Sequence, residues 1–286
     1  LPMRDVVSMT VINPVTLRAW ERRHGLLRPQ RTEGGHRLYT VGDVQRIRDI
    51  LRWTANGLSV SKVGDLLAAQ SEASAQQHSA FDDWRAAVVR ATKAFDGPAL
   101  EGIHGQLFTL LPKATVLREV LMPVWHDLAS GKAPGQRSQW VFLDTFLRAR
   151  LLLRLQVNQV DAPQVLLAGS EGQAELSVLC AGLLLSSELQ RIDVLGCGQP
   201  LEELPIVCAA MQPAALVIKV KAPVSPTLAK RLRSLQMEIA CPLALIGEGL
   251  ADSQPTLNGI PLCLLDEGGA DAARMLNALH SGALDV

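Results

Sequence analysis

The chain has 286 residues, enough for two or three domains; 48% of them are hydrophobic and only 4% aromatic, so leucine, valine and alanine must fill most of its cores. Its 28 basic and 28 acidic residues balance, which excludes a uniformly basic or acidic protein. The balance hides a gradient, because basic residues lead by 11 to 6 over 1–70 and by 10 to 8 over 71–159, whereas acidic residues lead by 14 to 7 over 160–286. This gradient is typical of a nucleic-acid-binding part joined to a part that leaves nucleic acid alone.

The sequence predicts neither a membrane span nor a cysteine framework. The longest apolar stretches, around Leu151 and Leu183, are interrupted by Arg154 and by Ser186-Ser187-Glu188, and they fall short of the roughly 18 to 20 residues of a span. No signal peptide precedes the first helix, so we expect a cytoplasmic protein without a membrane partner. The five cysteines lie in the C-terminal half without any C-x-x-C pair, which favours buried reduced thiols over zinc or disulfides.

The first predicted elements are a short helix over Met3–Met9 and a second helix that ends at His24. Asn13 can accept hydrogen bonds from the free N–H groups at the start of the second helix, and Pro14 suits its first position. Gly25 supplies the stop, since glycine adopts the left-handed conformation that often follows a helix. These signals predict a helix of about three turns.

This second helix is amphipathic, and a hairpin is predicted to follow it. Leu17 and Trp20 share one face, which can turn to a core. Leu26–Arg28 and Arg37–Tyr39 are short extended runs, joined through the turn-forming residues Thr32–Gly35. Basic residues line the other face of the helix and the hairpin: Arg18, Arg22, Arg23, Arg28, Arg31, His36 and Arg37.

A basic helix beside a basic hairpin is the shape of a winged helix-turn-helix, in which the helix enters a major groove and the wing contacts phosphates. The segment resembles the DNA-binding domain of MerR-family transcription regulators almost position by position, over VTLRAWERRHGLLRPQRTEGGHRLYTVGDV. The family's T-[IL]-R-x-[YW]-E-R, G-L-L-x-P-x-R, G-[YH]-R-x-Y and D-[VIL] motifs are all present, and the resemblance covers residues 1 to about 70. It implies a dimeric regulator, not an enzyme, that distorts double-stranded promoter DNA so that RNA polymerase can use it.

The resemblance also implies which side chains contact DNA. Thr16 and Arg18 should face bases or adjacent phosphates, and Trp20, which replaces the family's usual tyrosine, should lie along the DNA backbone. Phosphate contacts are expected from the remaining charged, imidazole and hydroxyl side chains of the segment: Arg22, Arg31, His36, Arg37 and Tyr39. No catalytic or metal-ligating set is expected beside them.

Helices dominate the middle of the chain. Thr40 is a good cap for a helix that runs to about Asn56, and Ser59 begins another helix. Residues 71–80 are polar and small, so we expect a linker or a frayed helix end between the head, residues 1–70, and the next domain. That domain, residues 81–160, should be a four-helix bundle, because four amphipathic patterns are separated by glycine and proline: 81–95, 98–111, 114–130 and 138–157.

The periodicity changes in residues 161–286. Five short apolar runs (QVLLA, RIDVLG, AALVIKV, PLALIG and PLCLL) occur with helical stretches at 173–190, 201–212, 226–238 and 269–280. Alternating strands and helices predict a flavodoxin-like α/β domain, whose parallel sheet is covered on both sides. A ligand would bind at the carboxyl ends of the strands, in the loops after Ala168, Leu195 and Val220.

A MerR-type head followed by a bundle and a flavodoxin-like domain resembles regulators whose C-terminal half is a cobalamin-binding module, including light-responsive ones. Such modules carry a D/E-x-H-x-x-G loop whose histidine ligates cobalt. Aligning on Glu175-Leu176 puts Ala174 at the histidine position and Ser177 at the glycine position, and alanine has no lone pair to offer a metal. The cobalamin-binding-like half is therefore degenerate.

The bundle of those regulators supplies a Trp followed after nine residues by Glu-His. Trp125 matches the tryptophan, but Gln139-Trp140 stand where Glu-His would align, and ordinary bundle core is the alternative reading of both tryptophans. The chain is similar in this respect to a MerR-like branch that regulates curli and biofilm-matrix genes and also has a degenerate C-terminal half. A ligand pocket, if kept, should include the following residues: Ser170, Glu171, Ala174, Ser177, Trp125 and Trp140.

Three uses of this half remain open. The expected one is a sensor or assembly module without a cofactor, which holds a homodimer or higher homo-oligomer on DNA. A second is a regulator that still binds cobalamin without the histidine. A third is a corrinoid carrier or enzyme, for which the sequence offers no clustered acid and base, since Glu171, Glu175 and Lys219 are isolated charges that are solvated or paired.

Overall fold

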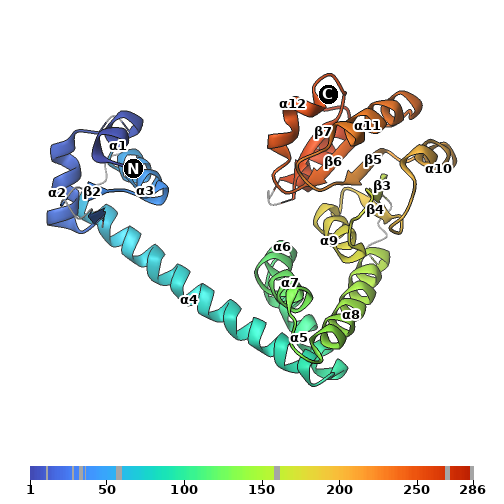
Figure 1. The fold of residues 1–286 in the computed structure, drawn as a ribbon, viewed down its shortest axis with the longest axis horizontal. Helices are drawn as coiled ribbons and strands as arrows, with labels where there is room; N and C mark the ends of the chain where they lie inside the picture. The colour runs from blue at the N-terminus through green and yellow to red at the C-terminus, as the bar shows by residue number, and fades with distance from the viewer. Residues whose placement is uncertain are drawn as a thin grey trace. The chain divides into compact units, whose positions relative to one another are not determined.

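A computed structural model of the chain describes residues 1–10, 12–27, 29–31, 35, 37–55, 60–157, 162–267 and 271–283. They divide into two compact units, Leu1–Asp82 and Asp83–Val286, and each is described by itself (Figure 1). The division falls inside helix α4 (Val60–Lys93), which is continuous through residues 71–80. The prediction of a linker or frayed end at 71–80 is therefore wrong; the alanines and glutamines there are good helix formers in spite of their polar neighbours.

The N-terminal unit contains the head, residues 1–70, with the predicted helices and a wing. Its elements are α1 (Met3–Thr10), α2 (Pro14–His24), β1 (Gln30–Arg31), β2 (Arg37–Leu38), α3 (Val41–Ala55) and the first part of α4. The caps of α2 are confirmed: the Asn13 side chain accepts a hydrogen bond from the N–H of Val15 at 2.8 Å, and Gly25, at φ +60°, donates its N–H to the carbonyl of Trp20. The helix therefore begins and ends where the sequence predicted.

The wing is built from a different first strand than predicted. β1 and β2 pair antiparallel, with Gln30 opposite Leu38 and Arg31 opposite Arg37. Leu26 and Leu27, in the predicted strand at 26–28, are instead buried in the core of the head. Both leucines lie outside the strands of the wing, which begins only at Gln30.

One hydrophobic cluster holds the head together. Leu17 and Trp20 of α2 pack there with Ile47 and Ile50 of α3, and Val63 joins them from α4. The start of α3 is fixed by a reciprocal cap, because the Thr40 hydroxyl accepts from the N–H of Asp43 at 3.1 Å while the Asp43 carboxylate accepts from the N–H of Thr40 at 2.8 Å.

The second unit begins with helices. The end of α4 is followed by α5 (Gly97–Leu110), α6 (Lys113–Thr115), the π-helix η1 (Val116–Leu121), α7 (Met122–Ser130) and α8 (Gln136–Val157). The last three helical patterns of the predicted bundle are thus confirmed to within a few residues, with a π-helix inside the third, whereas the first, 81–95, is the end of the longer helix α4. The buried face of α8 recurs every four residues: Leu143, Leu147, Leu151 and Leu155.

A five-stranded parallel sheet follows, in the order β4-β3-β5-β6-β7. Its strands are β3 (Gln164–Gly169), β4 (Arg191–Val194), β5 (Ala215–Lys219), β6 (Leu243–Gly247) and β7 (Cys263–Asp266). This is the predicted flavodoxin-like order, with the second strand at the edge beside the first. The short turns η3 (Leu250–Ser253) and α12 (Gln254–Leu257), between β6 and β7, were not predicted.

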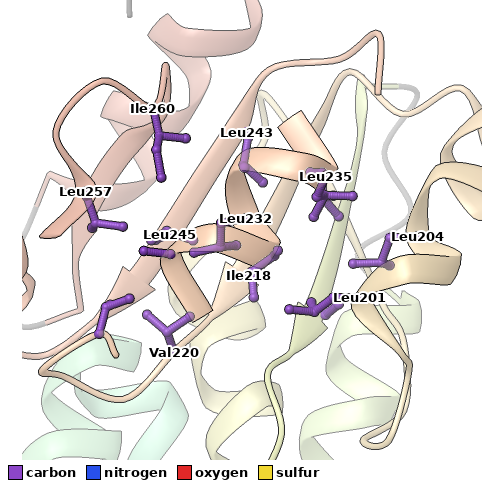
Figure 2. Packing of buried hydrophobic residues seen from close by; sticks show 14 of the residues in the cluster. Leu201, Leu204, Ile218, Val220, Leu232, Leu235, Leu243, Leu245, Leu257 and Ile260 are labelled. Atoms are coloured by element: carbon purple, nitrogen blue, oxygen red, sulfur yellow. The ribbon is translucent and has the colours of Figure 1, made fainter. Parts of the chain in front are cut away.

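Helices cover both faces of the sheet. On one face, η2 (Leu201–Glu203), α10 (Leu204–Met211), α11 (Pro226–Glu238) and α12 pack on leucine and isoleucine side chains of the strands (Figure 2). On the other face lie α9 (Glu175–Leu185), which contacts β3 and β4, and α13 (Ala272–His280), which contacts β7. Since both faces are buried, β5 and β6 are buried along their whole length, and neither shows an alternating pattern.

The bundle and the sheet belong to the same compact unit, although the sequence placed them in separate domains at 81–160 and 161–286. α8 packs along α9, and Arg148 of α8 forms an ion pair with Glu175 at the start of α9 (2.6 Å). Lys113 of α6 donates to the backbone carbonyl of Ser186, just after α9. Within the part of the chain that the structure describes, no helix is long and apolar enough to cross a membrane.

His104 is a buried histidine among the helices of the second unit. It is 5% exposed, its ring lies 4.7 Å from that of Phe108, and its Nε2 has no hydrogen-bond partner. Burial, followed by repulsion from Arg154 and Arg150, lowers the pKa of His104 to about 4, so the native state holds a neutral ring.

Because the folded pKa lies below the unfolded value of about 6.5, stability is present above pH 6.5 and is lost as the pH falls towards 4. We expect His104→Leu to melt about 2 to 4 °C above the wild type at pH 5, with a smaller difference at pH 8. Thermal melting of both proteins from pH 8 to pH 4.5 measures this, and titrations common to both cancel in the difference. A difference in Tm that is independent of pH would contradict a buried neutral imidazole.

Candidate functional site

Helix α2 presents cations on the face opposite its buried residues. Arg18 and Arg22 are exposed and lie four residues apart, so they share one side of the helix. Thr16 is partly exposed near the N-terminus of the same helix. The burial of Leu17 fixes which way this surface points, because α2 cannot rotate without exposing that side chain. The head therefore has a solvent-facing helix surface with two guanidinium groups in register.

An ion pair connects this helix to the wing. The Nε of Arg37, in β2, lies 2.5 Å from a carboxylate oxygen of Glu21, in α2, and both side chains are about four-fifths buried. The hydrogen bond that Arg37 donates to Glu21 is the main cause that raises the pKa of Arg37. The contact positions β2 against α2, so Arg37 acts within the head itself; its predicted phosphate contact stays a prediction.

Two of the predicted DNA contacts are contradicted by burial. Trp20 is 4% exposed in the core of the head and cannot lie along a DNA backbone. Tyr39 is 2% exposed, and its buried hydroxyl has no hydrogen-bond partner among the residues that the structure describes; burial is the main cause that raises its pKa. Of the others, Arg31 has its backbone in β1, and His36 lies outside the described residues.

The second unit contains a cavity of about 660 Å³ between helices and strand ends. One wall comes from α6, η1 and α7, and the other from the loop after β3, the face of α9, and the carboxyl ends of β5, β6 and β7. The predicted loops after Ala168 and Val220 contribute to it, whereas the loop after Leu195 does not. Gly247 allows the strand ends to approach closely, since a Cβ there would lie 2.6 Å from the carbonyl oxygen of Val220.

Three of the six predicted pocket residues line this cavity: Trp125, Ala174 and Ser177. Trp125 is also part of the bundle core, because its Nε1–H donates to Asp144 at 2.9 Å. Trp140 does not line the cavity; it is half-buried, with its ring centroid 5.5 Å from that of Trp125, so it is neither a pocket residue nor fully part of the buried core.

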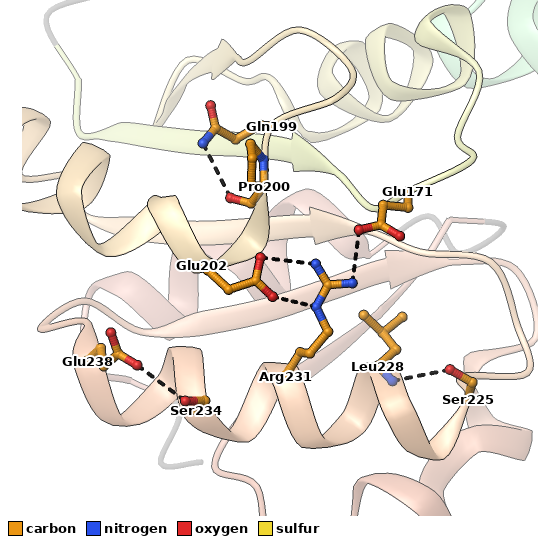
Figure 3. Close-up of polar contacts among 9 residues, drawn as sticks. All are labelled: Glu171, Gln199, Pro200, Glu202, Ser225, Leu228, Arg231, Ser234 and Glu238. Atoms are coloured by element: carbon orange, nitrogen blue, oxygen red, sulfur yellow. Dashed lines mark hydrogen bonds and ion pairs between the residues drawn. The ribbon is translucent and has the colours of Figure 1, made fainter.

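The other two predicted residues, Ser170 and Glu171, point elsewhere. The backbone N–H of Ser170 donates to the carbonyl of Lys219 at 2.9 Å, which ties the loop after β3 to β5. Glu171 accepts from Arg231 of α11, which also holds Glu202 through two hydrogen bonds (Figure 3). These contacts position the loop but place neither side chain in the cavity.

The strand-end wall carries charged residues that were not predicted as pocket residues. Lys219 forms an ion pair with Glu267, and their side chains are 7% and 13% exposed. Of the two states predicted for Lys219, solvated or paired, the structure shows the paired one. Lys221, Glu248 and Arg118 also line the cavity. A pattern in the sequence could have predicted the charged residues at the strand ends. β5, β6 and β7 each end at or just before a charged residue, and the carboxyl ends of parallel strands meet at one edge of the sheet.

The cavity does not fit a corrinoid ligated from the loop after β3. Ala174 caps α9 without a side-chain hydrogen bond and offers no lone pair. Burial raises the pKa of Cys180 to about 12, so this thiol stays protonated and is a poor ligand. His126 lines the cavity from α7, and its Nδ1–H donates to the carbonyl of Met122 at 2.8 Å. One imidazole is a weak basis for a metal site, and the described residues contain no group of three His, Cys, Asp or Glu that could hold one.

Comparisons with known proteins also distinguish the head from the rest of the chain. Residues 1–70 match the sequence profile described as MerR HTH family regulatory protein. The transcriptional regulator MlrA of Salmonella typhimurium (strain LT2) is 60% identical over 67 residues, which are 23% of this chain and 28% of MlrA. The matched part thus spans little more than a quarter of that relative.

Two further proteins are similar over most of the chain. The transcriptional repressor CarH of Myxococcus xanthus is 30% identical over 211 residues, which are 69% of this chain and 71% of CarH. The monomethylamine corrinoid protein of Methanosarcina barkeri matches in structure with a TM-score of 0.50 and 17% identity, over 71% of this chain and 98% of that one. At such low identity this likeness shows the fold of the helices and the sheet alone.

The Lys219–Glu267 pair generates a prediction about stability. Lys219→Met should lower the free energy of unfolding by about 3 kcal/mol, because it leaves a largely buried carboxylate without its cation. The double variant Lys219→Met/Glu267→Leu should recover most of this loss, since no charge is then left unpaired. Urea unfolding of the full chain measures both.

Glu171→Gln is the matched control, because the Glu171 side chain is 76% exposed in its ion pair with Arg231, and the loss should stay below about 1 kcal/mol. Equal losses in Lys219→Met and the control would show that the Lys219–Glu267 pair is solvated.

Proposed function

Because the chain belongs to the MerR family of helix-turn-helix transcription regulators, we propose that it binds double-stranded promoter DNA as a homodimer, with α2 in the major groove and the β1–β2 wing against the phosphates. The observation that carries this proposal is the outward face of α2, where Arg18 and Arg22 are exposed while Leu17 and Trp20 anchor the helix to the core. Two heads on one DNA would then read two half-sites related by the symmetry of the dimer.

The proposed contacts of α2 follow the exposure of its side chains, and those of the wing follow the resemblance to MerR-family heads. Thr16 and Arg18 contact bases or adjacent phosphates, and Arg22 contacts phosphate. Arg31, His36 and Arg37 hold phosphates from the wing, and the Glu21 ion pair sets the distance of Arg37 from α2. Trp20 and Tyr39 act indirectly, by fixing α2 and β2 to the core of the head.

We further propose that binding distorts the promoter and so activates its use by RNA polymerase. Such a distortion costs up to several kcal/mol, and phosphate contacts from two helices and two wings offset it. CarH carries the name of a repressor, which is the opposite sign of regulation. Transcription from a linear promoter template, with and without the protein, distinguishes the two signs.

The C-terminal half is the proposed sensor and assembly module, and it works without a corrinoid held from the loop after β3. The support for sensing is the cavity between η1–α7 and the strand ends. The argument against a corrinoid is the residue set at that loop, where Ala174 offers no ligand. Assembly is proposed because two heads must be held at a fixed half-site spacing.

The head can be tested by the salt dependence of binding. Arg22→Ala should weaken binding to promoter fragments and reduce the slope of log K against log [salt] by about one, as expected when one phosphate contact is lost. Fluorescence anisotropy at several salt concentrations measures the slope.

Lys230→Ala is the matched control, since this exposed lysine lies on α11, outside the head. If Arg22→Ala and Lys230→Ala gave the same slope as the wild type, Arg22 would make no phosphate contact and the proposed face of α2 would be wrong.

A further inference from the structure

Two cysteines lie side by side near the amino ends of the strands, at the opposite end of the sheet from the cavity described above. Cys208 belongs to α10, and Cys241 lies two residues before β6. The Cys208 thiol donates a hydrogen bond to the sulfur of Cys241. Both residues also pack in the hydrophobic cluster on this face of the sheet. The fold thus brings two reduced thiols close together, which is what a disulfide bond requires.

A cavity of about 550 Å³, the thiol cavity, opens onto this pair. Cys208 and Cys241 both line it, and the rest of its lining comes from α10, the end of α11 and the segments before β5 and β6. Cys241 is half-buried and Cys208 only 7% exposed, so a molecule in the cavity meets the Cys241 sulfur first. The volume is that of a site for a small molecule.

The charge of the lining narrows the class of molecule. Glu238, at the end of α11, lines the thiol cavity, and apart from the two thiols the other lining residues are uncharged. Its carboxylate accepts a hydrogen bond from the Ser234 hydroxyl at 3.2 Å (Figure 3). Since a carboxylate repels anions, the thiol cavity favours uncharged over anionic molecules.

The two thiols differ in reactivity. The hydrogen bond from Cys208 lowers the pKa of Cys241, although burial opposes the shift. Hydrogen bonding with Cys241 and burial both raise the pKa of Cys208. Because the thiolate is the nucleophile in thiol chemistry, Cys241 reacts first and Cys208 follows. Cys197 is more exposed than either, but partial burial and the charge of Glu175 raise its pKa, so exposure alone does not decide which thiol reacts.

We propose that Cys208 and Cys241 are a reversible modification site for small uncharged disulfides, which convert the pair to a disulfide bond between α10 and the segment before β6. The bond closes the chain over residues 208–241, which contain β5 and α11, and ties α10 covalently to the sheet. The proposal goes beyond the DNA binding and the sensing proposed above and rests on neither.

The reaction has two exchange steps. The Cys241 thiolate attacks one sulfur of the small disulfide RSSR, whose S–S bond breaks; a mixed disulfide forms on Cys241, and RS⁻ leaves. Cys208 then loses its proton, and its sulfur attacks the Sγ of Cys241, which forms the protein disulfide and releases a second RS⁻. The protons that the two cysteines gave up protonate the two released thiolates. The protein dithiol is oxidised by two electrons, and the reagent is reduced by the same two.

The first step removes part of the barrier to the second. In the mixed disulfide Cys241 carries no negative charge, so its effect on Cys208 disappears and burial is the main cause that still raises the Cys208 pKa. Cys208 therefore stays protonated until its partner has reacted. This order protects the buried thiol from reagents that do not first react at Cys241.

The test exposes the full chain to 2-hydroxyethyl disulfide, which is small and uncharged. Free thiols are trapped with N-ethylmaleimide, and mass spectrometry locates every modified cysteine. We expect the chain to lose two free thiols, with Cys208 and Cys241 in one cross-linked peptide, and dithiothreitol to restore both. Cys180 and Cys263, which are buried, should stay reduced and so show that the reagent meets the native fold.

The variants separate the two steps. Cys208→Ser should stop at a mixed disulfide on Cys241, and Cys241→Ser should leave Cys208 reduced. Cys208→Ala should form the mixed disulfide about threefold more slowly than Cys208→Ser, which keeps a hydroxyl donor: loss of one hydrogen bond costs about tenfold in thiolate, and higher nucleophilicity offsets part of this. Cys197→Ser is the matched control outside the thiol cavity and should form the disulfide at the wild-type rate.

Three results would overturn the proposal: a wild-type chain that keeps all its thiols, one that stops at a mixed disulfide on Cys241, or a disulfide between other cysteines. Equal rates for Cys208→Ala and Cys208→Ser would overturn the role of Cys241 as the activated thiol. Thermal melting in the reduced state confirms that each variant keeps the wild-type fold. No step involves DNA or the cavity between η1–α7 and the strand ends, so this test and the tests of the proposed function fail independently.

Discussion

The head depends on helix α2, which has one face buried in the core and one face exposed to solvent. α2 buries Leu17 and Trp20 among side chains of α3, and this burial fixes its rotation about its own axis. Once the rotation is fixed, Arg18 and Arg22 face solvent together. The wing is then tied to the same helix through Arg37 and Glu21, so the surface proposed for DNA is a consequence of packing inside the head.

A similar dependence shapes the C-terminal half. A parallel sheet buried on both faces brings the carboxyl ends of β3, β5, β6 and β7 to one edge, and α7 with η1 covers that edge from the bundle. The fold therefore makes a cavity whatever residues occupy it. Its chemistry is decided by a few side chains: Ala174 offers no metal ligand, and Lys219 with Glu267 places a buried ion pair on the floor. The helices and the sheet share the fold of the monomethylamine corrinoid protein of Methanosarcina barkeri.

The sequence predicted most elements because their signals are local. Asn13, Pro14 and Gly25 define α2, and five apolar runs separated by helical stretches define the sheet and its order. The errors have two causes, helix propensity in one case and burial in the core in the other. Helix α4 continues through small polar residues that looked like a linker, and Leu26 and Leu27 enter the core of the head where a strand was expected.

Site residues divide in the same way. Exposure of Arg18 and burial of Trp20 both follow from helical periodicity, but the buried state of Tyr39 and the pairing of Lys219 with Glu267 depend on residues far away in the sequence. The ends of the strands marked the location of the cavity correctly, whereas Glu171 was drawn away from it by Arg231, a partner 60 positions along the chain.

The proposed function is the binding of promoter DNA by a dimer of this chain. Footprinting of the chain on fragments of its own genome tests this binding. We expect a discrete protected palindrome with two half-sites about one helical turn apart, or a small multiple of it, and altered cleavage between them where the DNA is distorted. Uniform weak protection, equal on shuffled sequence and abolished by moderate salt, would contradict it, because such binding needs only charge and not the face of α2.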